Sequence, residues 1–377
     1  MIPEAGDTLS ENLKATTHKF LRGIVELAGA KYKHLQDKLT VKEIKIKLVA
    51  VARDESAYLP EWISHHLHFG FDEIEIHINR TSDNTLAIIK RYASLENVNI
   101  IDADDFFKDY PGNPQVGTYK KAFATAAKDG FSHLCFLDID EFWVPKDLVT
   151  SVKQCLIEFS LPDVVSFEWC NKYEPDNLFG PAVERSFQVE RVPQVKSIID
   201  ARAPSYRVNP HTIVNKYLTY KLADGTRFTH PTEGFSRVGE DQLNKPIKPY
   251  FILHRYYRSS KEYVSLLGKG RPNFPDQGVT QVKSNRRGYL IGSDVETVTF
   301  DSTAYENYRN AVDQSINKYT DQAELAHSRK TVLARYHRVL SIIEKSDNSQ
   351  APVLRKVLKN VNDEATLNAY RLFQARL

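Results

Sequence analysis

Cysteine is scarce in this chain of 377 residues, which contains only three. Cys135, Cys155 and Cys170 form no CxxC pair and no Cys/His zinc spacing, so we expect neither a disulfide framework nor a zinc site. Unpaired cysteines are typical of reducing compartments, which favours a cytoplasmic protein. The first residues contain neither a basic nor an apolar stretch, so we expect no secretory signal there.

Long apolar runs and a large charge of one sign are also missing. No run of about 18 apolar residues occurs, so we expect no membrane-spanning helix. Lys and Arg number 51 against 48 Asp and Glu, a net charge of +3, which argues against a protein that coats nucleic acid. Hydrophobic residues make up 41% and charged residues 26% of the chain, which excludes a disordered or coiled-coil class.

The hydrophobic pattern alternates between strands and helices from residue 44 onward. Strands are expected at 44–52, 72–78, 98–101, 133–137 and 164–169, and helices at 59–69, 85–95 and 115–128. This rhythm predicts βαβ units and therefore an α/β fold with a mostly parallel sheet flanked by helices. Beyond residue 185 we expect short strands and loops up to residue 230.

The two ends of the chain have helical patterns. These patterns span 9–38, 304–345 and 351–373, and a Gly- and Arg-rich stretch at 268–292 is typical of a mobile loop. We therefore expect an N-terminal helical extension at 1–43, an α/β domain at 44–275, and a loop with a helical C-terminal region at 276–377. The amphipathic ends suggest a homodimer or contact with a membrane surface.

Three polar clusters follow the predicted strands at the point where each strand ends. They are 53–55, 79–83 and 138–141. Because ligands of parallel sheets bind beyond the carboxyl ends of the strands, we expect these clusters to meet at one edge.

The acidic cluster is the strongest chemical signal. Asp138, Asp140 and Glu141 follow a buried strand and precede Phe142 and Trp143. Carboxylate oxygens suit Mg²⁺ or Mn²⁺, which neutralises a diphosphate, and three acids without a cation would repel one another. The alternative is a solvated acidic turn, but the apolar residues on both sides argue against it.

Several motifs resemble those of glycosyltransferases of family 2 type and of the related family 92, which have the GT-A fold. The matching segments are 51–55, 58–63, His66 with 70–72, the Asp-Ile-Asp-Glu-Phe run at 138–142, and 253–259. The resemblance covers roughly residues 45–275. Leu266 and Lys269 depart from it, since the family commonly has Lys and Arg there.

The resemblance implies a divalent cation, Mn²⁺ or Mg²⁺, and a nucleotide-sugar donor. Asp140 is the expected direct ligand, and Asp138 is expected near both the ribose and the ion. His254 is the expected further ligand and His211 a competing candidate, with His230 a weaker one. For His254 the equal alternative is a surface or core histidine beside Tyr256 and Tyr257.

The same resemblance points to residues that hold the donor. The candidates are Arg53, Asp54, Glu55, Asp83, Gln115, Asp138, Arg258 and Lys269. Asp54 and Asp83 precede helices, so helix capping is the alternative for both. Arg255 and Arg271 are further candidates for contact with the diphosphate. The run His65-His66-x-His68 lacks a carboxylate partner, and we expect no metal site there.

An inverting transfer needs a base that deprotonates the acceptor hydroxyl. Glu233, Asp224 and Glu168 all lie after the acidic cluster and before His254. Glu233 ranks first because it lies between Pro231 and Gly234, in a loop that a substrate could approach. The aromatic residues that fall where a sugar could pass are Trp143, Trp169, Tyr256 and Tyr257.

The resulting hypothesis is a metal-dependent, inverting glycosyltransferase. It would move a hexose from a nucleotide sugar, favouring a UDP-sugar, to a saccharide or glycolipid hydroxyl, in surface polysaccharide synthesis. A sugar-nucleotide pyrophosphorylase is one alternative, but residues 53–57 contain no glycine for a phosphate loop. A non-catalytic carbohydrate-binding protein is the other, and the intact Asp138 and Asp140 pair argues against it.

Overall fold

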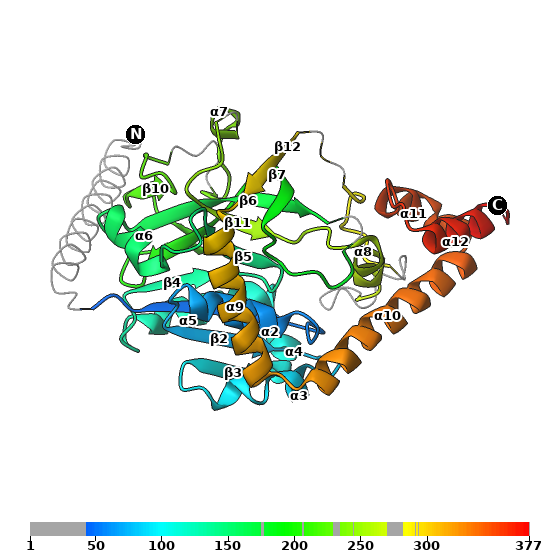
Figure 1. The fold of residues 1–377 in the computed structure, drawn as a ribbon, viewed down its shortest axis with the longest axis horizontal. Coiled ribbons are helices and arrows are strands. Elements are labelled where there is room, and N and C mark those ends of the chain that lie inside the picture. The colour runs from blue at the N-terminus through cyan, green and yellow to red at the C-terminus, as the bar shows by residue number, and fades with distance from the viewer. Residues whose placement is uncertain are drawn as a thin grey trace, which may run out of the picture.

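A ten-stranded mixed sheet forms the centre of the part of the chain that the structure describes (Figure 1). The computed structural model describes residues 43–174, 177–205, 207–228, 234–243, 245–269, 282–290, 292 and 294–376. The main path of the sheet has the strand order β3-β2-β1-β4-β7-β6-β11-β5. The predicted α/β fold with a mostly parallel sheet flanked by helices is confirmed.

The first half of the sheet is parallel. Its strands are β1 (Ile46–Ala52), β2 (Glu73–Ile78), β3 (Val98–Asp102) and β4 (His133–Phe136). The connecting helices are α2 (Leu59–His68), α3 (Thr85–Ile89), α4 (Asp104–Asp109) and α5 (Pro114–Ala126), with a 3₁₀ turn η1 at Tyr92–Ser94. The expected helix at 85–95 is thus split, because residues 90 and 91 separate α3 from η1. Helix α4 was not predicted.

The second half of the sheet mixes strand directions. It contains β5 (Glu141–Pro145), β6 (Val164–Tyr173), β7 (Ser186–Asp200), β10 (Tyr220–Leu222), β11 (Tyr250–His254) and β12 (Val295–Thr299), while β8 (Arg207–Val208) and β9 (Ile213–Val214) form a separate pair. Strand β7 is antiparallel to both β4 and β6, so it joins the two halves. The prediction of short strands directly after residue 185 is therefore wrong, because Ser186–Asp200 form one strand of 15 residues.

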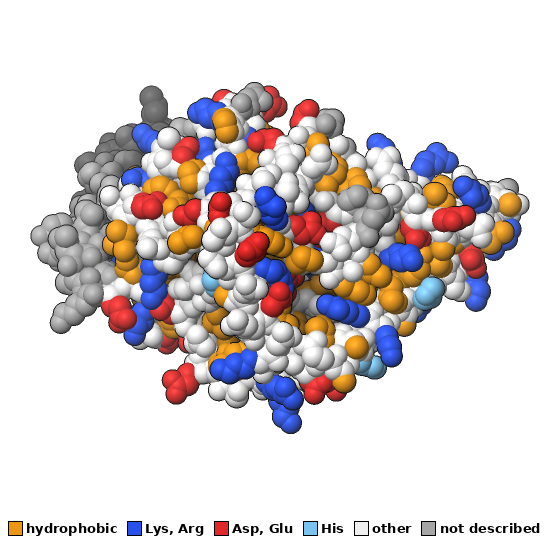
Figure 2. Space-filling view, viewed as in Figure 1, with side chains coloured by type: hydrophobic (Ala, Val, Ile, Leu, Met, Phe, Trp, Pro, Cys, Tyr) orange, Lys and Arg blue, Asp and Glu red, His pale blue; other side chains and the backbone are white. Residues whose placement is uncertain are grey.

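Helices cover both faces of the sheet. On one face, α2, α6 (Val152–Glu158) and α9 (Ser302–Tyr319) bury Trp62, Leu156 and Tyr308 in one apolar core. On the other face, α5 packs Tyr119 and Ala122 against the sheet. Lys and Arg side chains alternate with Asp and Glu over the face shown in Figure 2, in line with the small net charge.

The C-terminal helices form a third apolar cluster beside the sheet. The remaining helices are α7 (Glu240–Leu243), α8 (Ser260–Leu267), α10 (Gln322–Lys345), α11 (Ala351–Val357) and α12 (Glu364–Gln374), with a 3₁₀ turn η2 at Asn348–Gln350. The single helix expected at 304–345 is two helices, because α9 ends at Tyr319 and the Asp321 side chain caps α10. None of the described helices is long and apolar enough to cross a bilayer.

The expected division of the chain stays a prediction. The helix predicted at 9–38 lies outside the described residues. Helix α9, which the division assigns to the C-terminal region, shares the apolar core of the sheet through Tyr308 and Val312. Helix α9 thus packs on the sheet although it follows residue 275 in sequence.

Candidate active site

A cavity of about 480 Å³ opens at the sheet edge where β1, β2 and β4 end. The sequence-predicted site residues that line it are Arg53, Glu55, Gln115, Asp138, Asp140, His254 and Lys269. The predicted residues that do not line it are Asp54, Asp83, Glu168, His211, Asp224 and Arg258. Glu233, His230 and Arg271 lie outside the described residues. All three polar clusters expected at this edge contribute to the cavity wall.

The acidic turn between β4 and β5 is held by backbone and side-chain hydrogen bonds. The Asp138 amide donates to Glu141 Oε2 at 2.8 Å, so Glu141 caps the turn from within. The indole of Trp62 donates to the carbonyl oxygens of Asp138 and Glu141, at 3.1 and 2.8 Å. The Arg255 amide donates to the Asp140 carbonyl at 2.8 Å. The turn therefore presents Asp138 and Asp140 in a defined geometry.

Asp140 faces His254 across 3.7 Å, measured from Oδ2 to Nε2. His254 Nδ1 lies 3.0 Å from Asn171 Oδ1, an oxygen that can only accept a hydrogen bond, so Nε2 is the ring nitrogen that faces Asp140. Burial opposes the charge of Asp140, but His254, Arg258 and Arg286 hold the pKa of this carboxyl well below its usual range. The carboxylate is therefore ionised at neutral pH.

This pair fits a divalent cation. Two ligand atoms 3.7 Å apart lie within the span of two bonds of about 2.1 Å each. Among the described residues, no group of three or more His, Cys, Asp and Glu side chains is spaced for a metal ion. Mg²⁺ and similar ions commonly use one or two carboxylates together with substrate phosphates, so a two-ligand protein site is sufficient.

Asp138 has other partners than an ion. Gln115 Nε2 donates to its Oδ1 at 2.9 Å, and Lys196 Nζ lies 3.3 Å from its Oδ2. Lys196 also lies 2.9 Å from Glu141 Oε2 and is buried beneath the turn. Sequence reasoning missed Lys196, since only the pairing of β7 with β4 and β6 brings it there.

The opposite wall of the cavity is basic. Glu55 lies between Lys269 Nζ at 2.5 Å and Arg258 Nη2 at 3.4 Å, so these two cations are paired. Lys283 and Arg286 also line the wall and make no ion pair with a described residue. Burial and the neighbouring cations Arg286 and Lys269 lower the pKa of Lys283 to about 8. The run of basic residues at 283–287 was visible in the sequence, but not which of them face the cavity.

Asp54 and Asp83 bind each other's loops, and neither α2 nor α3 has a side-chain cap at its N-cap residue, so helix capping does not account for them. Asp54 Oδ1 accepts from the Ser82 amide at 2.6 Å, and Asp83 Oδ2 accepts from the Ser56 amide and hydroxyl at 3.1 and 2.7 Å. The φ angle of Asp54 is 53°, a conformation that residues other than glycine rarely adopt. These carboxylates thus fix the β1–α2 and β2–α3 loops behind Arg53 and Glu55.

Trp169 forms an aromatic wall beside the acidic turn. Its ring centroid lies 4.5 Å from that of His254 and 5.3 Å from that of His211. His211 Nδ1 lies 2.8 Å from the Val195 carbonyl oxygen, and burial lowers the pKa of this imidazole to about 4. Trp169 packs against both imidazoles, and His211 does not line the cavity, so the structure does not bring His211 to the Asp140 pair.

The described candidates for the base lie away from the cavity. Lys248 Nζ lies 2.7 Å from Asp224 Oδ2 and 3.7 Å from Glu168 Oε1. Arg191 of β7 also pairs with Glu168 of β6 at 2.6 Å, and Glu168 is buried.

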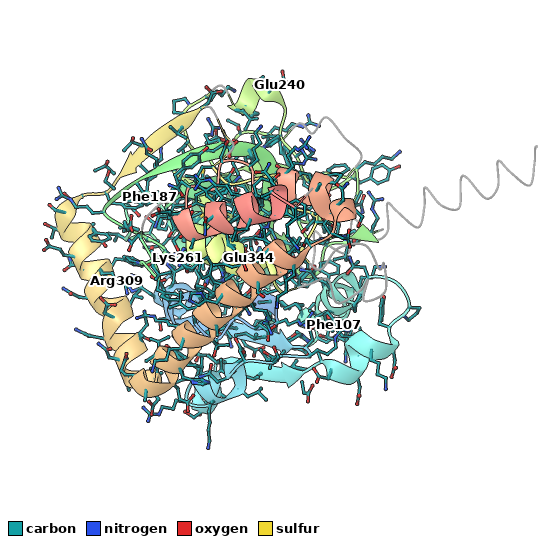
Figure 3. The ribbon with its side chains drawn as sticks, turned by 90° about the vertical axis from the view of Figure 1, so that its right-hand side faces the viewer. Phe107, Phe187, Glu240, Lys261, Arg309 and Glu344 are labelled. Atoms are coloured by element: carbon teal, nitrogen blue, oxygen red, sulfur yellow. The ribbon has the colours of Figure 1, made fainter. Side chains whose placement is uncertain are left out.

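Arg255 also lies outside the cavity. It pairs with both oxygens of Glu174, at 2.9 and 2.6 Å, and is buried. Arg255 instead lines a second cavity of about 340 Å³ together with Arg309 of α9. Figure 3 shows Arg309 on the opposite side of the molecule from Phe107, which lines the first cavity. Contact of Arg255 with a diphosphate in the first cavity is therefore not supported.

The histidines of α2 are structural, as the sequence indicated. His65 Nδ1 and Nε2 bond the Tyr308 hydroxyl and the Trp143 carbonyl, both at 2.8 Å. His66 Nδ1 donates to the Trp62 carbonyl at 2.8 Å. Burial lowers the pKa of both imidazoles, so they stay neutral within the core.

Comparison with known proteins confirms the resemblance. Residues 50–206 match the model of glycosyltransferase family 92. No curated protein gives a significant match.

Solved structures of low similarity include two structures of one protein and one structure of another. S. aureus TarS 1–349 is 12% identical at a TM-score of 0.28, over 88% of this chain and 90% of that chain. The same fragment in complex with UDP is 14% identical at a TM-score of 0.27, over 88% of this chain and 90% of that chain. HddC from Yersinia pseudotuberculosis is 11% identical at 0.29, over 48% of this chain and 89% of that chain. TM-scores this low support no inference, so the assignment as a glycosyltransferase rests on the family match.

Proposed function

We propose that this chain, a glycosyltransferase by its family 92 match over residues 50–206, transfers a hexose from a nucleotide sugar to a saccharide hydroxyl. The observation that carries the proposal is one cavity in which Asp140 and His254 share the wall with two cations, Lys283 and Arg286, that pair with no described carboxylate. Carboxylate, imidazole and cationic groups around one space suit a diphosphate and its counter-ion.

The donor would extend along the cavity from β2 toward Trp169. Asn79 and Phe107 border the end that we assign to the base, and Asp138 with Gln115 the ribose. Lys283 and Arg286 would donate to the diphosphate with charge-assisted hydrogen bonds. The sugar would then lie beside Trp169, whose ring offers an apolar face. A UDP-sugar is the donor that the family resemblance favours.

Asp140 and His254 would hold Mn²⁺ or Mg²⁺. When bound, such an ion neutralises the charge that develops on the departing diphosphate. The protein contributes the ionised Asp140 carboxylate and the oriented His254 imidazole to this function. The low pKa of Asp140 keeps the carboxylate available throughout the neutral range.

We propose an inverting reaction with Glu233 as the base. The carbonyl of Gly234, the next residue in sequence, accepts a hydrogen bond from Asn209 at 3.0 Å. Asn209 lies two residues before His211, which packs on Trp169. Asp224 and Glu168 are engaged by Lys248 and Arg191 outside the cavity, which makes them poor bases. A saccharide or glycolipid acceptor would approach from this side, and the free, buried cysteines favour a cytoplasmic setting.

The test is incubation with a panel of UDP-hexoses with and without Mn²⁺, reading UDP release. Asp140→Asn should abolish metal-dependent release while the fold is retained. Glu233→Gln should slow transfer by about 10²–10⁴-fold with UDP binding unchanged, because a positioned base typically contributes that factor. Asp224→Asn is the matched control and should behave as wild type. Absence of both metal-dependent UDP release and nucleotide binding would contradict the proposal.

A further inference from the structure

A buried lysine lies under the acidic turn, where the sequence suggests that only a metal ion could balance three carboxylates. Lys196 Nζ lies 2.9 Å from Glu141 Oε2 and 3.3 Å from Asp138 Oδ2. Only 1% of its side chain is exposed. The turn therefore contains a cation of its own.

The position of Lys196 is set by the sheet. It lies on β7, opposite Phe167 of β6, and the next residues of β7 pair with β4. Because β4 leads directly into the acidic turn, the ammonium group reaches the turn from below. The Trp169 ring, 5.9 Å away from Nζ, closes the space on its other side.

Lys196 is charged in this setting. Burial alone would lower the pKa of the amine, but Asp138 and Glu141 outweigh it and raise the pKa above its ordinary value. Burial also raises the pKa of Glu141 well above its ordinary value, so the single positive charge of Lys196 is most directly a partner for Asp138. Lys196 makes no ion pair with Asp140, which faces His254 instead.

We infer that Lys196 is a positioning residue that keeps Asp138 off the divalent ion and directs it, with Gln115, toward the donor. This inference rests on the proposed function and deepens it. Lys196 lies 3.3 Å from Asp138 Oδ2 and Gln115 donates to Oδ1, so both oxygens are engaged by the protein, and the ammonium would repel a cation brought to the same carboxylate. The protein alone then offers the ion two ligands, so the ion binds weakly until the diphosphate supplies the rest.

The test measures Mn²⁺ binding to the full chain without nucleotide, by the electron paramagnetic resonance signal of free Mn²⁺. Lys196→Met should tighten Mn²⁺ binding by about tenfold or more, because a unit charge near the ion is removed and the Asp138 carboxylate is released. The same variant should raise the KM for the donor, since Asp138 loses its orientation. Lys196→Arg keeps the charge and should restore Mn²⁺ affinity close to wild type.

Lys47→Met is the matched control. Lys47 is also a buried lysine between two carboxylates, 2.9 Å from Glu73 and 3.0 Å from Glu75, but it lies at the far end of β1. The Lys47→Met variant should have a lower free energy of unfolding and an unchanged affinity for Mn²⁺.

A second pair of variants covers the case in which Lys196→Met does not fold. Asp138→Asn should leave Mn²⁺ affinity in the absence of nucleotide unchanged, whereas Asp140→Asn should abolish binding. Weaker Mn²⁺ binding in Asp138→Asn, or an unchanged affinity in folded Lys196→Met, overturns the inference. Mn²⁺ affinity that depends on Lys196 in a protein that transfers no sugar would support the inference and contradict the proposed reaction, so the two failures are distinguishable.

Discussion

Lys283 is a cavity cation whose charge depends on pH. Its amine faces Arg286 and Lys269 rather than a close carboxylate partner, and burial together with these neighbours lowers its pKa to about 8. A lysine with this pKa is charged at neutral pH but becomes neutral within a mildly alkaline range. Lys283 can therefore offer the diphosphate a positive charge only at pH values below that alkaline range.

The first prediction follows from this pKa. Affinity for UDP should fall by about tenfold as pH rises through about 8 and beyond, because a charge-assisted hydrogen bond is lost when the amine deprotonates. Lys283→Arg should remove the decline, since a guanidinium stays charged to high pH. Isothermal titration with UDP from mildly acidic to alkaline pH measures both. A wild-type affinity that does not change across this range would exclude Lys283 from the diphosphate site.

At the residue scale, sequence reasoning found the acidic side of the site better than the basic side. Asp138, Asp140 and His254 stand in contiguous motifs next to strands, so their meeting could be predicted. Lys196 stands in a strand that contains Pro193 and several polar residues, and nothing local marks it as part of a site. Its role depends on strand order, which one sequence does not specify.

Helix α10 connects two parts of the cavity wall. Near its start, Glu324 accepts from Asn84 Nδ2 at 2.7 Å, beside the loop that Asp83 holds. Farther along, Arg335 Nε donates to Ser265 of α8, at 3.2 Å to the carbonyl and 3.1 Å to the hydroxyl. Because Lys269 follows α8, α10 supports both the β2–α3 loop and the basic wall.

The second prediction tests the contact between α8 and α10. A Cβ at Gly268 would lie 2.7 Å from Val339 Cγ2 and 3.1 Å from Arg335 Cγ, so Gly268→Ala overpacks this contact. We expect a loss of about 1–3 kcal/mol in the free energy of unfolding and a higher KM for the donor. The double variant with Val339→Ala should recover part of the donor affinity, because it makes room for the methyl group. Urea denaturation and steady-state kinetics provide the readouts, and unchanged stability in Gly268→Ala would contradict the prediction.

At the element scale, hydrophobic periodicity predicted the regular strands, whereas a capping side chain set a helix boundary that periodicity missed. The strands at 44–52 and 72–78 combine clear apolar patterns with glycine or polar ends, and the structure has them there. The expected helix at 304–345 failed because its apolar pattern continues across Thr320, whereas the Asp321 side chain accepts from the amides of Ala323 and Glu324. A capping aspartate within a helical pattern was the available signal.

The whole molecule depends on helices that lie after the cavity residues in sequence. Tyr308 of α9 is buried and bonds His65 of α2, which in turn bonds the Trp143 carbonyl in β5. Removal of α9 would expose this core and leave His65 without its hydroxyl partner. The sheet and the C-terminal region therefore share stability.

The third prediction concerns truncation. A chain that ends at residue 275 should not unfold cooperatively, because it lacks the apolar surface of α9 and α10 that covers α2 and α8. Near-ultraviolet circular dichroism and a thermal melt, compared with the full chain, measure this. A sharp transition like that of the full chain would instead support the boundary predicted from the sequence.

Strand order also sets when the acidic turn can take its shape. Strand β5 begins at Glu141 and lies at one end of the main path of the described sheet. There it pairs with β11, which spans Tyr250–His254. During synthesis, chains are made at roughly 5–20 residues per second, and the N-terminal parallel strands emerge first. Until the ribosome has released β7 and β11, the carboxylates of the turn lack both Lys196 and the strand that carries His254. A nascent chain paused in this interval would hold an incomplete half-sheet with open edges, the type of intermediate that chaperones bind.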